Sequence, residues 1–185
     1  MVEVKILIEG YIRHGSGIVC STCTLIRDDG LNIVIDPGTV KNQKEIINAL
    51  KKEKLGVNDI DLVCITHSHL DHYRNIGMFP KAKSLDYWGL WDKNRLKFNT
   101  KPRQFTKNIQ ILMTPGHSYD GISLIVKTKT GKVAICGDIY WRKDYPKKDI
   151  YANNQKRLLQ DRKLLLKIAD FIIPGHGSMF ATKKI

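Results

Sequence analysis

Thr66-His67-Ser68-His69-Leu70-Asp71-His72 is the stretch that decides the fold, and it follows a short apolar run expected to be a buried strand. In an extended chain, residues two apart point the same way, so His67 and His69 can reach one metal ion together. Asp71 and His72 follow where a turn from strand to helix is expected, so they can serve a neighbouring ion. Imidazole nitrogens and carboxylate oxygens suit zinc, and also iron or manganese.

Three later segments place similar side chains directly after apolar runs: Thr114-Pro-Gly-His117, Cys136-Gly-Asp138 and Pro174-Gly-His176. Loops at strand ends are where a rigid scaffold presents a site. The Pro-Gly pairs make tight turns that end a strand and aim the next side chain, and Gly137 lets backbones come close. We expect one ion on His67, His69 and His117, a second on Asp71, His72 and His176, and Asp138 as the bridge.

The alternative for any one of these histidines is an ordinary buried core residue. Five of the six histidines fall in these segments together with two acids, and this clustering favours a metal centre. Asp36 and Asp120 are weaker candidates. Asp36 precedes Pro37-Gly38, where it either accepts backbone N–H bonds or orients a metal ligand.

The order of expected elements suits a sandwich of sheets with helices outside, and not a regular βαβ alternation. There is no GxGxxG motif and no P-loop for a nucleotide. The segment 82–106 is less regular. Hydrophobic periodicity predicts strands at 2–9, 18–27, 31–36, 61–66, 109–113, 123–127, 133–136 and 171–173, and helices at 42–55, 71–78 and 153–169.

The length of 185 residues suits a single domain, 1–185, that can bury a real core. No apolar run approaches the roughly 20 residues needed to cross a bilayer. The first ten residues alternate like a strand and do not look like a signal peptide. We therefore expect a cytoplasmic protein without a membrane segment, and the oligomeric state stays open.

Cys20 and Cys23 form a CxxC pair, which is found in redox and zinc sites. No second Cys or His pair at zinc-knuckle spacing is left over. The pair lies in a β-type run, and Cys64 and Cys136 also lie in apolar runs. Reduced core cysteines in a reducing compartment are the favoured interpretation.

The net charge is +13, with 31 Lys and Arg against 18 Asp and Glu. Such a field attracts polyanions, so nucleic acid, a phosphorylated metabolite or an acidic cofactor thioester are candidate partners. A solvated basic surface without a ligand is the alternative. The segment 88–103 mixes aromatic and cationic residues, which can stack on unpaired bases and hold phosphates, or can form a hydrophobic flap.

The stretch His67-Ser-His69-Leu-Asp71-His72 resembles the HxHxDH signature of the metallo-β-lactamase superfamily, and His117, Asp138 and His176 match the later ligands in order. The resemblance implies an α/β (α+β) fold: an αββα sandwich of two mixed β-sheets with outer helices and a dinuclear centre at one edge. Within the superfamily, segments 75–80 and 169–177 most resemble the family of metallo-β-lactamase domain-containing protein 1. That family is associated with RNA cleavage, in histone pre-mRNA processing.

This chemistry predicts a hydrolase with two divalent ions, expected to be Zn²⁺, with iron or manganese as alternatives. A water shared by two cations ionises near neutral pH, and Asp71 is the candidate catalytic residue that orients it. Single-stranded RNA is the first substrate hypothesis. The alternatives are a carbonyl ester (thioester, lactone or promiscuous β-lactam) and a non-catalytic binder. Arg13 and His14, in a glycine-flanked loop, either contact substrate or are simply solvated.

Overall fold

The computed structural model describes residues 2–13, 15–98 and 103–182 as two β-sheets packed face to face. The first sheet is mixed, because β5, β6 and β7 pair in parallel and the other neighbours pair antiparallel. Its strands, in spatial order, are β1 (Glu3–Ile8), β4 (Cys23–Asp28), β5 (Leu31–Ile35), β6 (Leu62–Cys64), β7 (Lys83–Leu85), β8 (Gly89–Asp92) and β9 (Arg95–Phe98).

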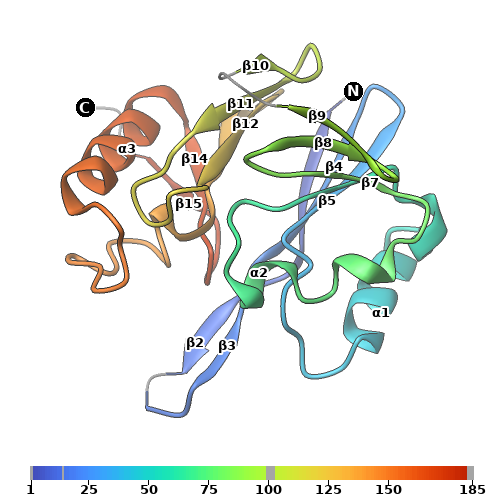
Figure 1. Ribbon diagram of the computed structural model, residues 1–185, viewed down its shortest axis with the longest axis horizontal. Helices are drawn as coiled ribbons and strands as arrows, with labels where there is room; N and C mark the ends of the chain where they lie inside the picture. The colour runs from blue at the N-terminus through green and yellow to red at the C-terminus, as the bar shows by residue number, and fades with distance from the viewer. Residues whose placement is uncertain (1, 14, 99–102, 183–185) are drawn as a thin grey trace.

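The second sheet is also mixed, with β13 and β14 parallel and the remaining pairs antiparallel. Its strands, in spatial order, are β10 (Arg103–Gln104), β11 (Ile109–Met113), β12 (Ile122–Thr128), β13 (Gly131–Ile135), β14 (Phe171–Ile173) and β15 (Phe180–Ala181). A separate hairpin, β2 (Tyr11–Arg13) with β3 (Ile18–Cys20), extends away from both sheets at the bottom of Figure 1.

Helices cover the outer face of each sheet, so the layers run α, β, β, α as expected (Figure 1). The helix α1 packs on the first sheet and α3 on the second. The helices are α1 (Lys44–Lys52), α2 (Leu70–Tyr73) and α3 (Gln155–Ile168), with short 3₁₀ turns η1 (Val57–Asp59), η2 (Ile76–Met78) and η3 (Gly137–Ile139).

Successive side chains of a central strand point to opposite faces, and here both faces are buried. In β5, Ile33 and Ile35 join the core between the sheets, whereas Val34 joins the core under α1. In the second sheet, Leu124 faces the core between the sheets and Ile125 faces α3. Double burial explains why these strands have continuous apolar sequences instead of an alternating pattern.

The expected strand 18–27 was wrong as one element, because it is divided into β3 and β4 at Ser21 and Thr22. There the backbone N–H of Thr22 donates to the carbonyl of Gly175, 2.6 Å away, and the Ser21 hydroxyl bonds the carbonyl of Asp36. These bonds tie the break to the loops that carry the site. The preceding loop contains β2, so the glycine-flanked segment is a hairpin arm.

The sequence predicted no regular element in segment 82–106, whereas its described residues contain the short strands β7 to β10. Strands β8 and β9 lie at the edge of the first sheet and are mostly exposed. Charged residues occupy many of their positions, so the sequence lacks the alternation of apolar residues that predicts a strand. The expected helix 71–78 is shorter than predicted and is divided into α2 and η2. No helix in the described part of the chain is both long and apolar enough to cross a membrane.

Candidate metal centre

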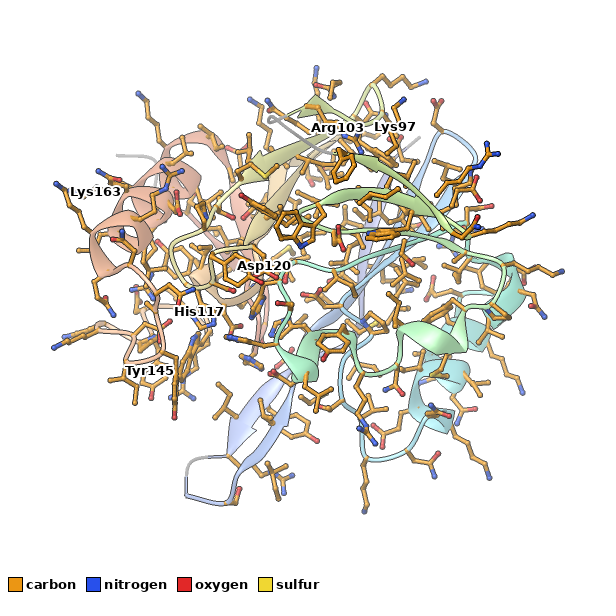
Figure 2. All side chains as sticks on the ribbon, viewed as in Figure 1. Lys97, Arg103, His117, Asp120, Tyr145 and Lys163 are labelled. Carbon is orange, nitrogen blue, oxygen red and sulfur yellow. The ribbon has the colours of Figure 1, made fainter. Side chains whose placement is uncertain are left out.

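Seven side chains meet at one edge of the sandwich, on loops that leave strands of both sheets. The loop after β6 carries His67 and His69, and α2 carries Asp71 and His72. The second sheet supplies the other three, each just after β11, β13 or β14: His117, Asp138 and His176. Figure 2 shows His117 between α3 and α2, above the base of the β2–β3 hairpin.

The first group of ligand atoms consists of three imidazoles and one carboxylate. His67 Nε2 lies 3.0 Å from His69 Nδ1, and His117 Nε2 lies 3.1 Å from the same atom. Asp138 Oδ2 lies 3.6 Å from His117 Nε2. All four side chains could therefore contact one ion.

The second group consists of Asp71, His72 and His176. Asp71 Oδ2 lies 3.7 Å from His72 Nε2 and 3.5 Å from His176 Nε2. The other oxygen of Asp138, Oδ1, lies 3.3 Å from His72 Nε2 and 3.2 Å from His176 Nε2. Asp138 Oδ2 also lies 3.3 Å from His176 Nε2, so the carboxylate lies between the two groups and is close to both, as a bridging ligand must be.

The donor set fits divalent metal ions. Ligand atoms about 2.0–2.1 Å from a tetrahedral zinc lie about 3.3–3.4 Å from one another, close to the distances in both groups. Two buried atoms, His72 Nε2 and Asp138 Oδ1, have no partner in hydrogen-bonding geometry within the described chain. Buried polar atoms without partners are costly, and a cation between them would remove that cost.

Four of the five imidazoles form a hydrogen bond through Nδ1, on the side of the ring away from the centre. Each Nδ1 faces an acceptor, so the proton stays on Nδ1 and the lone pair of Nε2 points into the centre. The acceptors are Thr66 Oγ1 for His67 (3.2 Å), Asp36 Oδ2 for His72 (2.8 Å), Asp149 Oδ2 for His117 (2.6 Å) and the Cys20 carbonyl for His176 (2.9 Å). His69 instead turns Nδ1 inward.

Three acids outside the two groups hold these loops. Asp36 accepts hydrogen bonds from the N–H and the hydroxyl of Thr66 and from His72. It therefore both binds a backbone N–H and orients a candidate metal ligand, the two alternatives that the sequence offered. Asp120 accepts from Ser68 N and from the Ser118 hydroxyl and so connects two ligand loops. Asp149 was missed, because it lies in a lysine-rich segment without a motif.

The metal-free electrostatics of the cluster show strong coupling. Burial, with the nearby His72, lowers the pKa of His67 well below its ordinary value. Burial also opposes charge on His72, but Asp36 and Asp138 outweigh it and raise the pKa of His72 well above the usual range. His176 and His72 likewise outweigh burial and hold the pKa of Asp138 well below its usual range. Metal ions would therefore compete with protons for these groups.

Two glycines are required for the close approach of the loops. Gly137 has φ +50°, and a Cβ there would collide with Thr66 Oγ1. A Cβ on Gly175 would collide with Asp138 Oδ1. The sequence predicted that Gly137 lets backbones come close; the atoms that a Cβ at Gly137 would meet belong to the side chains of Thr66 and His67.

A pocket of about 570 Å³ opens over both groups. The β2–β3 hairpin forms one wall with Ile12 and Arg13, and Trp141 with Tyr151 forms another, their rings stacked 5.8 Å apart. Arg13 therefore lies where substrate contact was expected, whereas His14 is outside the described residues. Lys97 and Arg103, from the segment proposed to hold RNA, lie at the top of Figure 2, away from His117.

The four cysteines are buried free thiols. Burial raises the pKa of Cys20 to about 11 and that of Cys136 to about 12, and it raises those of Cys23 and Cys64 as well. Such thiols stay protonated and unreactive at neutral pH, as core cysteines should.

Comparison with known proteins shows the family of this chain. A protein of Xenopus laevis named metallo-beta-lactamase domain-containing protein 1 is 28% identical over 98% of this chain and 82% of its own length. The match covers 59–62% of the length of the mammalian proteins of that name. A probable metallo-hydrolase of Methanocaldococcus jannaschii is 30% identical, covering 100% of this chain and 91% of its own.

A third relative is a hydroxyacylglutathione hydrolase of Haemophilus influenzae, 28% identical over 84% of this chain and 85% of its own. A metallo-β-lactamase-fold crystal structure from Thermotoga maritima matches with a TM-score of 0.75 and 22% identity, covering 97% of this chain and 99% of its own. The model of the metallo-beta-lactamase superfamily matches residues 19–111. This chain therefore belongs to the metallo-β-lactamase superfamily and is a metallohydrolase of that fold.

Proposed function

We propose that this chain hydrolyses the carbonyl ester bond of a small substrate, such as a thioester or a lactone. The pocket over the metal centre carries the proposal. Its walls include Ile12, Ile18, Val19, Trp141 and Tyr151, and Arg13 is the one Arg or Lys among the described lining residues. Apolar walls with a few convergent polar groups are typical of small-molecule sites, whereas a polyanion groove needs many cations.

His67, His69 and His117 would hold one ion, Asp71, His72 and His176 the other, and Asp138 both. Zn²⁺ suits this nitrogen-rich set best, with iron or manganese as alternatives. Two such ions supply a water that ionises near neutral pH and polarise the bond under attack.

Asp71 is proposed as the catalytic residue that orients the attacking water. Its side chain remains 20% exposed, whereas Asp138 is buried between the two groups. The carboxylate of Asp71 can therefore accept a hydrogen bond from the attacking water at the pocket floor and fix its orientation. Asp138 holds the two halves of the centre together.

Arg13 is proposed to bind a carboxylate or carbonyl oxygen of the substrate. It lies at the end of β2 on the hairpin wall, and its guanidinium lies 5.4 Å from the centroid of the Tyr11 ring. A guanidinium on an arm over an apolar pocket suits recognition of a polar end group. His14, the next residue, is proposed as a second substrate contact.

The test is hydrolysis of a hydroxyacylglutathione thioester and of an N-acyl homoserine lactone by zinc-loaded protein. We expect metal-dependent turnover that Asp138→Ala abolishes. Arg13→Ala should raise KM more than it lowers kcat, and Lys163→Ala, on α3 at the left of Figure 2, should change neither. Absence of turnover on both ester classes, with two metals bound, would overturn the proposal.

Cleavage of single-stranded RNA is the second candidate. The charge of +13 and the exposed aromatics Trp88, Trp91 and Phe98 near β8 and β9 favour it. Zinc-loaded protein and the Asp138→Ala variant would be incubated with end-labelled RNA at low salt. Metal-dependent cleavage that weakens steeply with salt would support this candidate.

The proposed location is the cytoplasm. Four free buried thiols fit a reducing compartment of this kind.

A further inference from the structure

A second pocket, of about 290 Å³, lies on the other side of the ligand loop. His67 and Ser68 line it, whereas His69 lines the pocket described above. The two pockets share no lining residue among those described, and the ligand loop lies between them.

Aromatic rings from three separate segments form the walls of this second pocket. Tyr73 comes from α2, Tyr87 and Trp88 from the turn between β7 and β8, and Tyr119 from the loop after His117. Tyr73, Trp88 and Tyr119 are 37%, 50% and 59% exposed, and the rings of Tyr87 and Trp88 meet edge to face at 5.3 Å. Several large rings left exposed around one pocket indicate a binding site.

Two carboxylates complete the lining, and both are fixed by neutral donors. Asp86 accepts from the backbone N–H of Trp88 (2.9 Å) and of Gly89 (3.0 Å), and from Trp91 Nε1 (3.1 Å). Asp120 accepts from Ser68 N (3.0 Å) and from the hydroxyl of Ser118. Neutral donors hold both carboxylates in place without cancelling their charge.

Neither acid forms an ion pair with a Lys or Arg in the described part of the chain, although the chain carries 31 such residues. Asp86 and Asp120 therefore bring two carboxylates without a Lys or Arg partner to the lining of the second pocket. Aromatic faces combined with carboxylates are the surroundings that bind organic ammonium groups.

We propose that the second pocket binds an alkylated ammonium group on the leaving-group side of the ester. This step rests on the proposed esterase function for its place in the reaction, but the binding itself does not. The rings supply cation–π contacts, and Asp86 and Asp120 supply the opposite charge. The substrate class is then an ester or thioester of an amino alcohol or amino thiol.

Binding is tested by titrating zinc-loaded protein with tetramethylammonium chloride while tryptophan fluorescence is recorded, at constant ionic strength. The neutral isostere 3,3-dimethylbutanol is titrated in parallel. Tetramethylammonium should bind more tightly than the isostere. Asp86→Asn should raise its Kd about 5-fold, the effect of losing an exposed charge pair worth about 1 kcal/mol. Trp88→Leu should weaken binding and remove most of the fluorescence change.

Asp92→Asn is the matched control, since Asp92 is exposed on β8 and paired with Lys83 outside the pocket. It should leave the Kd unchanged. Equal binding of the cation and the isostere, or equal effects of Asp86→Asn and Asp92→Asn, would overturn the inference. Stronger binding of a neutral nucleoside than of the cation would overturn it too, and would indicate base stacking.

Hydrolysis separates this inference from the proposed function. Acetylthiocholine should be turned over with a lower KM than the thioester of 3,3-dimethylbutanethiol. Hydrolysis of both with equal KM would refute the ammonium pocket and leave the esterase intact. Cation binding that depends on Asp86, without hydrolysis of any ester, would refute the esterase and leave the pocket intact.

Discussion

Replacement of Asp149 by Asn should selectively weaken the first metal position. Asp149 Oδ2 accepts the Nδ1 proton of His117 at 2.6 Å, and both side chains are buried. Its other oxygen accepts from Tyr151 N at 2.9 Å. An Asn that keeps the bond to Tyr151 presents its NH₂ group to His117. Because NH₂ can only donate, the imidazole proton would move to Nε2 and block the atom that faces the centre.

The magnitude follows from that tautomer change. Loss of a partner that orients a metal-binding histidine typically costs about 10- to 100-fold in metal affinity. This factor corresponds to about 1.4–2.7 kcal/mol. The second group should keep its affinity, because His72 is held by Asp36 and His176 by the Cys20 carbonyl.

The assay is competition for zinc between the protein and a chromophoric chelator, fitted for two sites. The variant should show one weakened and one unchanged site. Asp161→Asn is the control, because this buried acid pairs with Arg157 and has no hydrogen bond or ion pair with a histidine among the described residues. Two unchanged sites, or two sites weakened equally in a variant with native circular dichroism, would refute the reasoning from the Asp149–His117 bond.

Three further predictions follow from the same structure. Asp138→Ala should lower the metal content of reconstituted protein at both positions, as measured by atomic emission, because its two oxygens face both groups; retention of two ions would contradict a bridging role. Leu165 is fully buried on α3, so Leu165→Ala should lower the free energy of unfolding in urea by about 2–5 kcal/mol. Leu164 is 39% exposed, so Leu164→Ala should lower it far less. Similar losses for the two variants would contradict the packing of α3. At pH 8 the thiols of the folded protein should react with iodoacetamide much more slowly than free cysteine, since a pKa of about 11 for Cys20 leaves about 0.1% thiolate. The rate of labelling should increase as the pH rises toward that pKa. Rapid labelling of folded protein at pH 8 would contradict the burial of the thiols.

The sequence by itself determined the members of the ligand cluster and their places at strand ends. The pattern around His67 to His72 and the glycines before Asp138 and His176 act locally: a strand ends, the backbone turns tightly, and the next side chain is aimed. Continuous apolar runs such as 33–35, within the predicted strand 31–36, also identified the central strands correctly, because strands buried on both faces need no alternation.

Only the tertiary structure showed which residues support and surround the cluster. Asp149 reaches His117 across 32 positions, and the Cys20 carbonyl reaches His176 across 156. Edge strands β8 and β9 escaped prediction because half-exposed strands carry a weak hydrophobic period. The pairing of β2 with β3 and the two pockets depend on contacts between segments distant in sequence. Such contacts are set by how the two sheets pack, and local propensity carries no information about them.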